Sequence, residues 1–251
     1  MEVKLKWQNK SYWADLAKPM HIAIPLRNGI EHQANAFGAP PFEASPLKAG
    51  NFVGSLEAGA SVNFYNVRVN PHGNGTHTET VGHITVGEAA IHTQLNVSHC
   101  VAEVVSVYPT KVSNGDRLIS KDVLEEMTRN RSDALIVRTL PNEKDKMTRK
   151  YTGTNPAYFS EEAMRWIVGK SYKHLLTDLP SVDREEDGGA LVSHKLFWGL
   201  PENKLDKRTI TEMIYVDNDI DDGLYLLDLQ IAPLILDASP SRPVLYKLNP
   251  T

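Results

Sequence analysis

Short apolar runs separated by polar turns recur along the chain and predict β-strands. Runs of about 4–8 residues rich in Val, Ile, Tyr and Phe, bounded by Gly, Asn or Pro, are typical of strands. Such runs cover residues 20–26, 61–69, 101–107, 134–139, 174–178, 209–216 and 224–230. A further apolar run at residues 231–236 follows the last of these. The pattern therefore predicts a chain rich in strands, most of all in its last third.

Two segments with helical spacing lie between these runs. Ser120 and Ser160 each precede one of them and are suited to be N-caps. In the first segment, Val123, Leu124 and Met127 fall on one face, as in a helix that packs against a core. Helix and strand alternate here without a linker-like stretch. We therefore expect one α/β domain over residues 1–251, with a mixed β-sheet flanked by helices.

Composition narrows the class of protein. The 251 residues are 41% hydrophobic and 23% charged, and the formal net charge is −4, which disfavours a nucleic-acid binder. Apolar runs fall far short of the ~20 residues that a membrane-spanning helix needs, so no membrane span is expected. Cys100 is the only cysteine and the N-terminus lacks an apolar leader, so we expect a cytoplasmic protein without an internal disulfide.

Proline and glycine mark two irregular segments. Residues 35–49 contain three prolines and are expected to form a long loop, in which Phe37 and Phe42 are candidates to line a substrate pocket. Residues 70–77 combine glycines with asparagines and predict a tight turn that follows a strand.

The densest chemical signal follows this turn. If the backbone is extended there, alternation places His77, Glu79 and His83 on one side, where a metal ion could lie between imidazole and carboxylate. Farther along, Glu212 lies in an otherwise apolar stretch, which is costly for a carboxylate that has no partner. The alternatives are solvated histidines in a polar loop and a Glu212 on the wet face of its strand. Taken alone, each cluster gives only a weak indication of a metal site.

Several motifs together resemble the metal-dependent cyclase family, which includes bacterial kynurenine formamidase and isatin hydrolase. The family signature reads His-x-Gly-Thr-His-x-Asp-x-Pro-x-His, and the corresponding stretch here is Gly73-Asn74-Gly75-Thr76-His77-Thr78-Glu79-Thr80-Val81-Gly82-His83. The resemblance extends to residues 24–29, 38–42 and 179–183, continues through His194 and Glu212, and ends in a closing loop at residues 237–243. It covers most of the chain from about residue 20 onward.

The resemblance implies a metal-dependent hydrolase of a carbon–nitrogen bond in an amide, formamide or cyclic amide, similar to arylformamidases. It implies Zn²⁺ or Mn²⁺ bound by His77, Glu79, His194 and Glu212, with His83 as the proton-transfer residue. The fold would be the swivelling β/β/α type of this family. A small-molecule substrate and a homodimer or higher homo-oligomer are expected. The ion would activate water and polarise the carbonyl of the substrate.

Three departures from the signature change this expectation. Gly73 stands where the signature has its first histidine, Glu79 replaces the aspartate, and Val81 replaces the proline. His72 lies one position earlier, and on an extended chain a shift of one residue would point it to the other face. We therefore expect one ion per chain, and a Gly73→His substitution that restores a ligand if the backbone permits it. The alternatives are a member altered in catalysis that binds a metal or small molecule, and a purely structural α/β protein.

Overall fold

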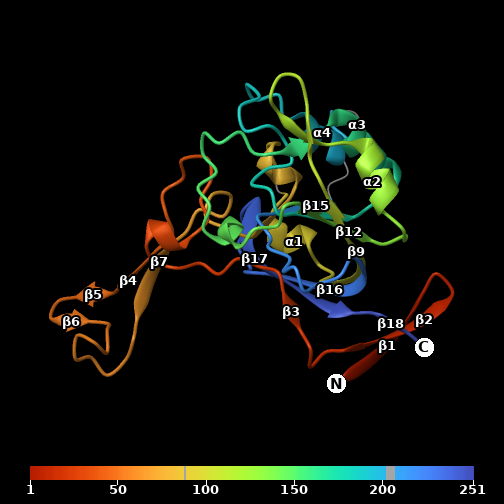
Figure 1. The fold of residues 1–251 in the computed structure, drawn as a ribbon. Helices are drawn as coiled ribbons and strands as arrows, with labels where there is room; N and C mark the ends of the chain where they lie inside the picture. The colour runs from red at the N-terminus through yellow and green to blue at the C-terminus, as the bar shows by residue number, and fades with distance from the viewer. Residues whose placement is uncertain (88, 202–206) are drawn as a thin grey trace.

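The structure is a computed structural model that describes residues 1–87, 89–201 and 207–251. A mixed sheet that closes on itself forms its centre (Figure 1). In order across the sheet, the strands are β16 (Gly223–Ile231), β9 (His99–Val107), β12 (Ala134–Thr139), β14 (His174–Thr177), β15 (Thr209–Glu212), β8 (His77–Glu79), β17 (Ala238–Lys247) and β3 (Met20–His21). Strands β9, β12, β14 and β15 run parallel to one another. The remaining pairings in this sheet are antiparallel. Because β16 also pairs with β17, the sheet closes into a barrel.

Three of the helices, α2 (Lys121–Met127), α3 (Glu161–Gly169) and α4 (Val192–Phe197), pack against one face of this sheet, and the remaining helices are short. These are α1 (Ile91–Gln94) and the 3-10 helices η1 (Ile30–His32), η2 (Val81–His83) and η3 (Lys144–Met147). Ser120 and Ser160 are the N-caps of α2 and α3, and they accept hydrogen bonds from the backbone N–H groups of Val123 and Ala163. The expected α/β fold with a mixed sheet and flanking helices is confirmed.

The core lies on both faces of the sheet. Leu135 and Val137 of β12 pack into a cluster with Leu124 of α2 and Met164 of α3. The alternate residue Ile136 packs into a second cluster with strand residues from the opposite face. Every residue of β12 is buried, as expected for a parallel strand that is covered on both sides.

Smaller sheets lie at the periphery. The N-terminal hairpin of β1 (Glu2–Trp7) and β2 (Lys10–Asp15) pairs with β18 (Asn249–Pro250). A second small sheet contains β10 (Thr110–Lys111), β11 (Arg117–Ile119) and β13 (Tyr158–Phe159). An arm at residues 43–68 projects away from the barrel (Figure 1) and consists of β4 (Glu43–Pro46) paired with β7 (Tyr65–Arg68), and β5 (Lys48–Ala49) paired with β6 (Phe52–Val53).

Several expected elements differ from the structure. The segment 35–49 is not a loop throughout, because its second half forms the arm strands β4 and β5. The apolar run at 231–236 is not a strand beyond Ile231, and its Ile235 and Leu236 are exposed. Residues 238–243, expected in a closing loop, begin the long strand β17. Within the described ranges, no helix has the length and apolar character needed to cross a membrane.

Candidate metal centre

The pairing of β8 with β15 brings two distant parts of the chain together. In this antiparallel ladder, His77 lies opposite Glu212 and Glu79 lies opposite Ile210. His77 and Glu79 share one face because side chains alternate along the strand. Thr78 faces the other way, and its Oγ1 lies 2.8 Å from Oγ1 of Thr211. The predicted extended backbone is therefore present at residues 77–79, but it does not continue to His83, which lies in the 3-10 helix η2, so alternation does not place His83.

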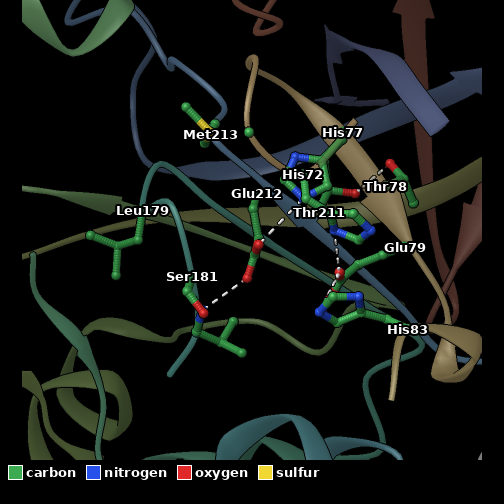
Figure 2. Close-up of polar contacts among 12 residues, drawn as sticks. His72, His77, Thr78, Glu79, His83, Leu179, Ser181, Thr211, Glu212 and Met213 are labelled. Atoms are coloured by element: carbon green, nitrogen blue, oxygen red, sulfur yellow. Dashed lines mark hydrogen bonds and ion pairs between the residues drawn. The ribbon is translucent and has the colours of Figure 1, made fainter. Parts of the chain in front are cut away.

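Glu212 is buried at the end of β15, with only 3% of its surface exposed. Its Oε1 accepts a hydrogen bond of 2.8 Å from the backbone N–H of Val182, and its Oε2 lies 3.4 Å from Nε2 of His77. Figure 2 shows its carboxylate directed toward the imidazole rings. The interpretation of Glu212 as a residue on a solvated strand face is wrong.

His194 reaches the same point from helix α4. Its Nε2 lies 3.0 Å from Oε1 of Glu79 and 3.9 Å from Oε1 of Glu212. Its Nδ1 lies 2.6 Å from Oδ2 of Asp183, whose carboxylate also accepts the backbone N–H groups of Ser193 and His194. Since a carboxylate only accepts, Nδ1 of His194 carries the proton and Nε2 is directed to the centre. Asp183 therefore accepts from the first turn of α4 and also orients the imidazole of His194.

Two buried atoms at the centre, Nε2 of His77 and Oε2 of Glu79, make no hydrogen bond of acceptable geometry within the described residues, although they lie 3.4 Å from Oε2 of Glu212 and 3.2 Å from Nδ1 of His72. Nδ1 of His77 lies 2.9 Å from the carbonyl oxygen of Gly75, which fixes the proton on Nδ1 and leaves a lone pair on Nε2. Buried polar atoms without a partner are rare and require an explanation. A bound cation between an imidazole nitrogen and a carboxylate oxygen explains both atoms.

His72 also lies at this centre, which the sequence analysis did not expect. Its Nδ1 lies 3.2 Å from Oε2 of Glu79, and its ring packs edge-on against that of His77 (Figure 2). Residues 71–75 form a turn and not an extended strand, so the alternation rule does not apply to them. The expectation that His72 points to the other face is therefore wrong.

Gly73 has no positive φ, but it lies in close contact with a neighbouring loop. A Cβ at this position would come within 2.2 Å of Cβ of Ala39 and 3.2 Å of the carbonyl oxygen of Ala36. The condition attached to Gly73→His, that the backbone permits a side chain, is therefore not met unless the loop at Ala39 moves.

His83 and Asp237 lie beside this cluster. Nε2 of His83 lies 3.9 Å from Oε2 of Glu79, and its ring stacks on that of His72 with centroids 4.2 Å apart. Oδ2 of Asp237 lies 2.8 Å from Nε2 of His72 and 3.3 Å from Nδ1 of His83. Asp237 was not identified as a site residue from the sequence, where its only signal was the resemblance of the segment that it begins.

The electrostatics of the cluster reflect its density of imidazoles and carboxylates. Burial alone would lower the pKa of His72, but its contacts with Asp237 and Glu79 raise it to about 10. Burial likewise opposes charge on both His194 and Glu79, yet their attraction raises the pKa of His194 and lowers that of Glu79. These directions identify a buried site that favours positive charge, which protons or a metal ion can supply.

A cavity of about 560 Å³ opens directly onto the cluster. Its wall includes His72, His83, His194 and Glu212, together with Phe37 from the loop that precedes the arm. Phe42 is half-buried and is not among the lining residues, so its assignment to the substrate site stays a prediction. The cavity is large enough for a small aromatic molecule and gives it direct access to the histidines.

The donors therefore fit a divalent metal ion. Groups of side chains whose potential ligand atoms lie within 4.8 Å of one another include His72 with His77 and Glu79, and Glu79 with His83 and His194. Imidazole nitrogen and carboxylate oxygen are ligands that suit zinc and manganese. Glu212 belongs to neither group but lies 3.4 Å from Nε2 of His77 and 3.9 Å from Nε2 of His194, so the expected ligand set stays a prediction.

Comparisons with known proteins point to one family. The family described as "Cyclase: Putative cyclase" matches residues 14–184. None of the curated proteins matches the chain.

Solved structures resemble the fold over nearly its whole length. One is described as a predicted metal-dependent hydrolase from Bacillus stearothermophilus, with 18% sequence identity, a TM-score of 0.64, and coverage of 91% of this chain and 98% of that chain. An isatin hydrolase A from Labrenzia aggregata, bound to benzyl benzoate, has 13% identity, a TM-score of 0.63 and coverages of 91% and 93%. An isatin hydrolase A from Ralstonia solanacearum has 13% identity, a TM-score of 0.61 and coverages of 91% and 91%. At these identities, the likeness shows the fold.

Proposed function

Because this chain belongs to the cyclase family, we propose that it is a metal-dependent hydrolase of a carbon–nitrogen bond in an amide, formamide or cyclic amide. The observation that carries the proposal is the convergence of buried imidazoles and carboxylates, with two unpartnered atoms, beside a cavity of about 560 Å³. Similar folds described as metal-dependent hydrolase and isatin hydrolase support this class of reaction. An arylformamidase-like substrate is the narrower form of the proposal.

We propose Zn²⁺ or Mn²⁺ as the ion, held by His77, Glu79, His194 and Glu212 with His72 as an additional donor. We keep one ion per chain as the expectation, and two ions per chain on elemental analysis would show that His72, 3.2 Å from Glu79, takes the place of the first signature histidine. A divalent ion in such a set lowers the pKa of a water ligand to about 7 and polarises a carbonyl group.

The side chains around the ion site have separate tasks in this proposal. His83 lines the cavity with its Nε2 near Glu79, where it can transfer a proton to the nitrogen that leaves. Asp183 holds the ring of His194 in the tautomer that directs Nε2 to the centre. Phe37 contributes an aromatic surface at the cavity mouth and would contact the apolar part of the substrate.

The alternative is a family member altered in catalysis that binds a metal or a small molecule. Its main support was the glycine at the first signature position. Since His72 brings an imidazole to within 3.2 Å of Glu79, that support is lost. We therefore favour the hydrolase.

A homodimer or higher homo-oligomer is a further part of the proposal. The projecting arm carries exposed apolar side chains, which are Phe52, Leu56, Val62, Phe64 and Val67. Exposed apolar side chains gathered on one element are typical of protein contacts. Light scattering on the purified protein, with Phe64→Ser as the variant, tests whether the arm joins copies of the chain. We also keep a cytoplasmic location, in line with a single cysteine, Cys100.

The decisive experiment measures metal and activity together. Protein purified without added metal is analysed for zinc and manganese, and is then assayed with aryl formamides, aryl amides and cyclic aryl amides. We expect hydrolysis that a chelator abolishes and that zinc or manganese restores. His194→Ala should lose both metal and activity, whereas His99→Ala, at an exposed histidine remote from the site, should lose neither.

The outcomes separate the two functions. Tightly bound metal without hydrolysis of any of these amides would favour the binding protein. Hydrolysis that persists after complete removal of metal would contradict the proposed function.

A further inference from the structure

Asp237 contacts two histidines that have different tasks in the proposed function. Its Oδ2 lies 2.8 Å from Nε2 of His72 and 3.3 Å from Nδ1 of His83. The two rings are stacked with centroids 4.2 Å apart, so a single carboxylate oxygen reaches both of them from one side. Neither contact involves the nitrogen that each ring directs toward Glu79.

The backbone holds Asp237 firmly in this place. Asp237 directly precedes β17, in which Ala238 lies opposite Glu79 in the ladder with β8. Its carbonyl oxygen accepts hydrogen bonds from the backbone N–H of Thr80, at 3.0 Å, and from Oγ1 of Thr80, at 3.2 Å. The register that places Glu79 in the site therefore also places the Asp237 carboxylate beside the two rings.

A carboxylate in this position determines which nitrogen of each ring carries a proton. An ionised carboxylate only accepts, so Nε2 of His72 and Nδ1 of His83 donate to it. Nδ1 of His72 lies 3.2 Å from Oε2 of Glu79, and an ion bound there would replace the proton on Nδ1 and use its lone pair, while Nε2 keeps its proton toward Asp237. Nε2 of His83 is left with a lone pair that faces the cavity side of Glu79, where it can accept a proton.

The same arrangement occurs on the opposite side of the site. Asp183 accepts from Nδ1 of His194 at 2.6 Å and leaves Nε2 of His194 directed to Glu79. Carboxylates that accept from the outer nitrogen of a metal-binding histidine fix its orientation, and their loss typically lowers metal affinity by about 10–100-fold. Asp237 is the counterpart of Asp183, with the difference that it serves two rings.

We propose that Asp237 is a positioning residue that fixes His72 as a metal ligand and His83 as a proton acceptor through one shared carboxylate oxygen. This inference rests on the proposed function, since it assigns His72 to the ion and His83 to the reaction. It predicts that metal binding and proton transfer are both disturbed by a change at one residue that touches neither ion nor substrate.

The test uses zinc affinity and the tautomers of the rings. Zinc affinity is measured on the full chain by competition with a chromophoric chelator, for wild type, Asp237→Asn and Asp228→Asn. Asp228 is a matched control, because its Oδ1 lies 3.5 Å from Nε2 of the exposed His99, far from the site in the ladder of β16 with β9. We expect Asp237→Asn to weaken zinc binding by about 10–100-fold and Asp228→Asn to leave it unchanged.

Long-range ¹H–¹⁵N spectra of zinc-loaded wild type provide a readout that needs no variant. They should show a proton on Nε2 of His72 and on Nδ1 of His83. The opposite tautomer on either ring, or an Asp237→Asn protein with unchanged zinc affinity, would overturn the role of Asp237 while leaving the proposed function intact. A wild-type protein that binds no zinc or manganese would overturn both.

Discussion

The close approach of two loops at Gly73 can be tested by adding a single methyl group. In Gly73→Ala, the new Cβ would lie 2.2 Å from Cβ of Ala39, whereas ordinary contacts begin at 3.4 Å. The two loops would therefore have to separate by more than about 1 Å. The hydrogen bond of 3.0 Å from the backbone N–H of Ala36 to the carbonyl oxygen of Gly73 ties the same loops together and resists this movement.

Two opposing effects set the expected change in the unfolding free energy of Gly73→Ala. Forcing an extra carbon into a packed position typically costs about 1–3 kcal/mol. Replacing glycine by alanine where the backbone is compatible lowers the conformational entropy of the unfolded chain, which stabilises the folded protein by about 0.4–1 kcal/mol. Gly169→Ala is the matched control, because Gly169 has open space around its Cβ position and no positive φ. The difference in unfolding free energy between the two variants should therefore be about 1–3 kcal/mol, since the backbone effect is common to both.

The assay is urea unfolding of both metal-free variants, followed by zinc titration. His72 is the neighbour of Gly73 in the turn, so movement of this loop should also withdraw its Nδ1 from Glu79 and weaken zinc binding by about tenfold or more. If Gly73→Ala unfolds at the same urea concentration as Gly169→Ala and binds zinc as wild type does, the loops are not packed as described.

Three further changes test other parts of the molecule. His83→Ala should leave metal content unchanged and slow turnover by about 10²–10⁴-fold, and loss of metal would instead make His83 a ligand. Glu212→Gln should weaken metal binding by more than about tenfold, which elemental analysis after dialysis against a chelator would detect. Burial lowers the pKa of His174 to about 4, so the unfolded chain binds a proton more readily than the folded one between pH 6.5 and 4. Stability should fall by about 3 kcal/mol as the pH drops through this range, less so in His174→Asn, and equal pH dependence of the urea midpoints would contradict the assignment.

Local patterns predicted the central strands because those strands are buried on both faces. The apolar run at residues 134–139 coincides with β12, whose side chains face one cluster or the other along its whole length. Among the arm strands, β7 lies within the predicted run at residues 61–69 although all its residues are exposed, whereas β4, which contains a proline, lies in a segment predicted to be a loop. Strand β17 begins with Ala238, Ser239 and Pro240, which carry little β-propensity, and its pairing with β8, β16 and β3 comes from the closure of the barrel.

The histidines of the site show the limit of a rule based on alternation. It placed His77 and Glu79 correctly because they lie in a strand, and it failed for His72 because a turn precedes that strand. In the turn, Asn70 accepts at its backbone carbonyl from the N–H groups of Gly73 and Asn74, and this reverses the chain. The asparagines and glycines of residues 70–77 indicated a turn, but they did not indicate where its side chains would point.

The burial of this cluster is itself an argument against a purely structural protein. His77, Thr78 and Glu79 are fully buried, and Glu212 and His194 beside them are nearly so. Burying ionisable groups carries a desolvation penalty that apolar side chains of similar volume avoid, so such a cluster adds little to the stability of a fold. Here Asp183 and the carbonyl of Gly75 accept from the outer nitrogens of His194 and His77, and the N–H of Val182 donates to Glu212, while Nε2 of His77 and Oε2 of Glu79 make no hydrogen bond of acceptable geometry within the described residues. An arrangement that is satisfied on its outside and unsatisfied at its centre is what binding of a cation requires, and the cavity beside it gives a substrate access to that cation.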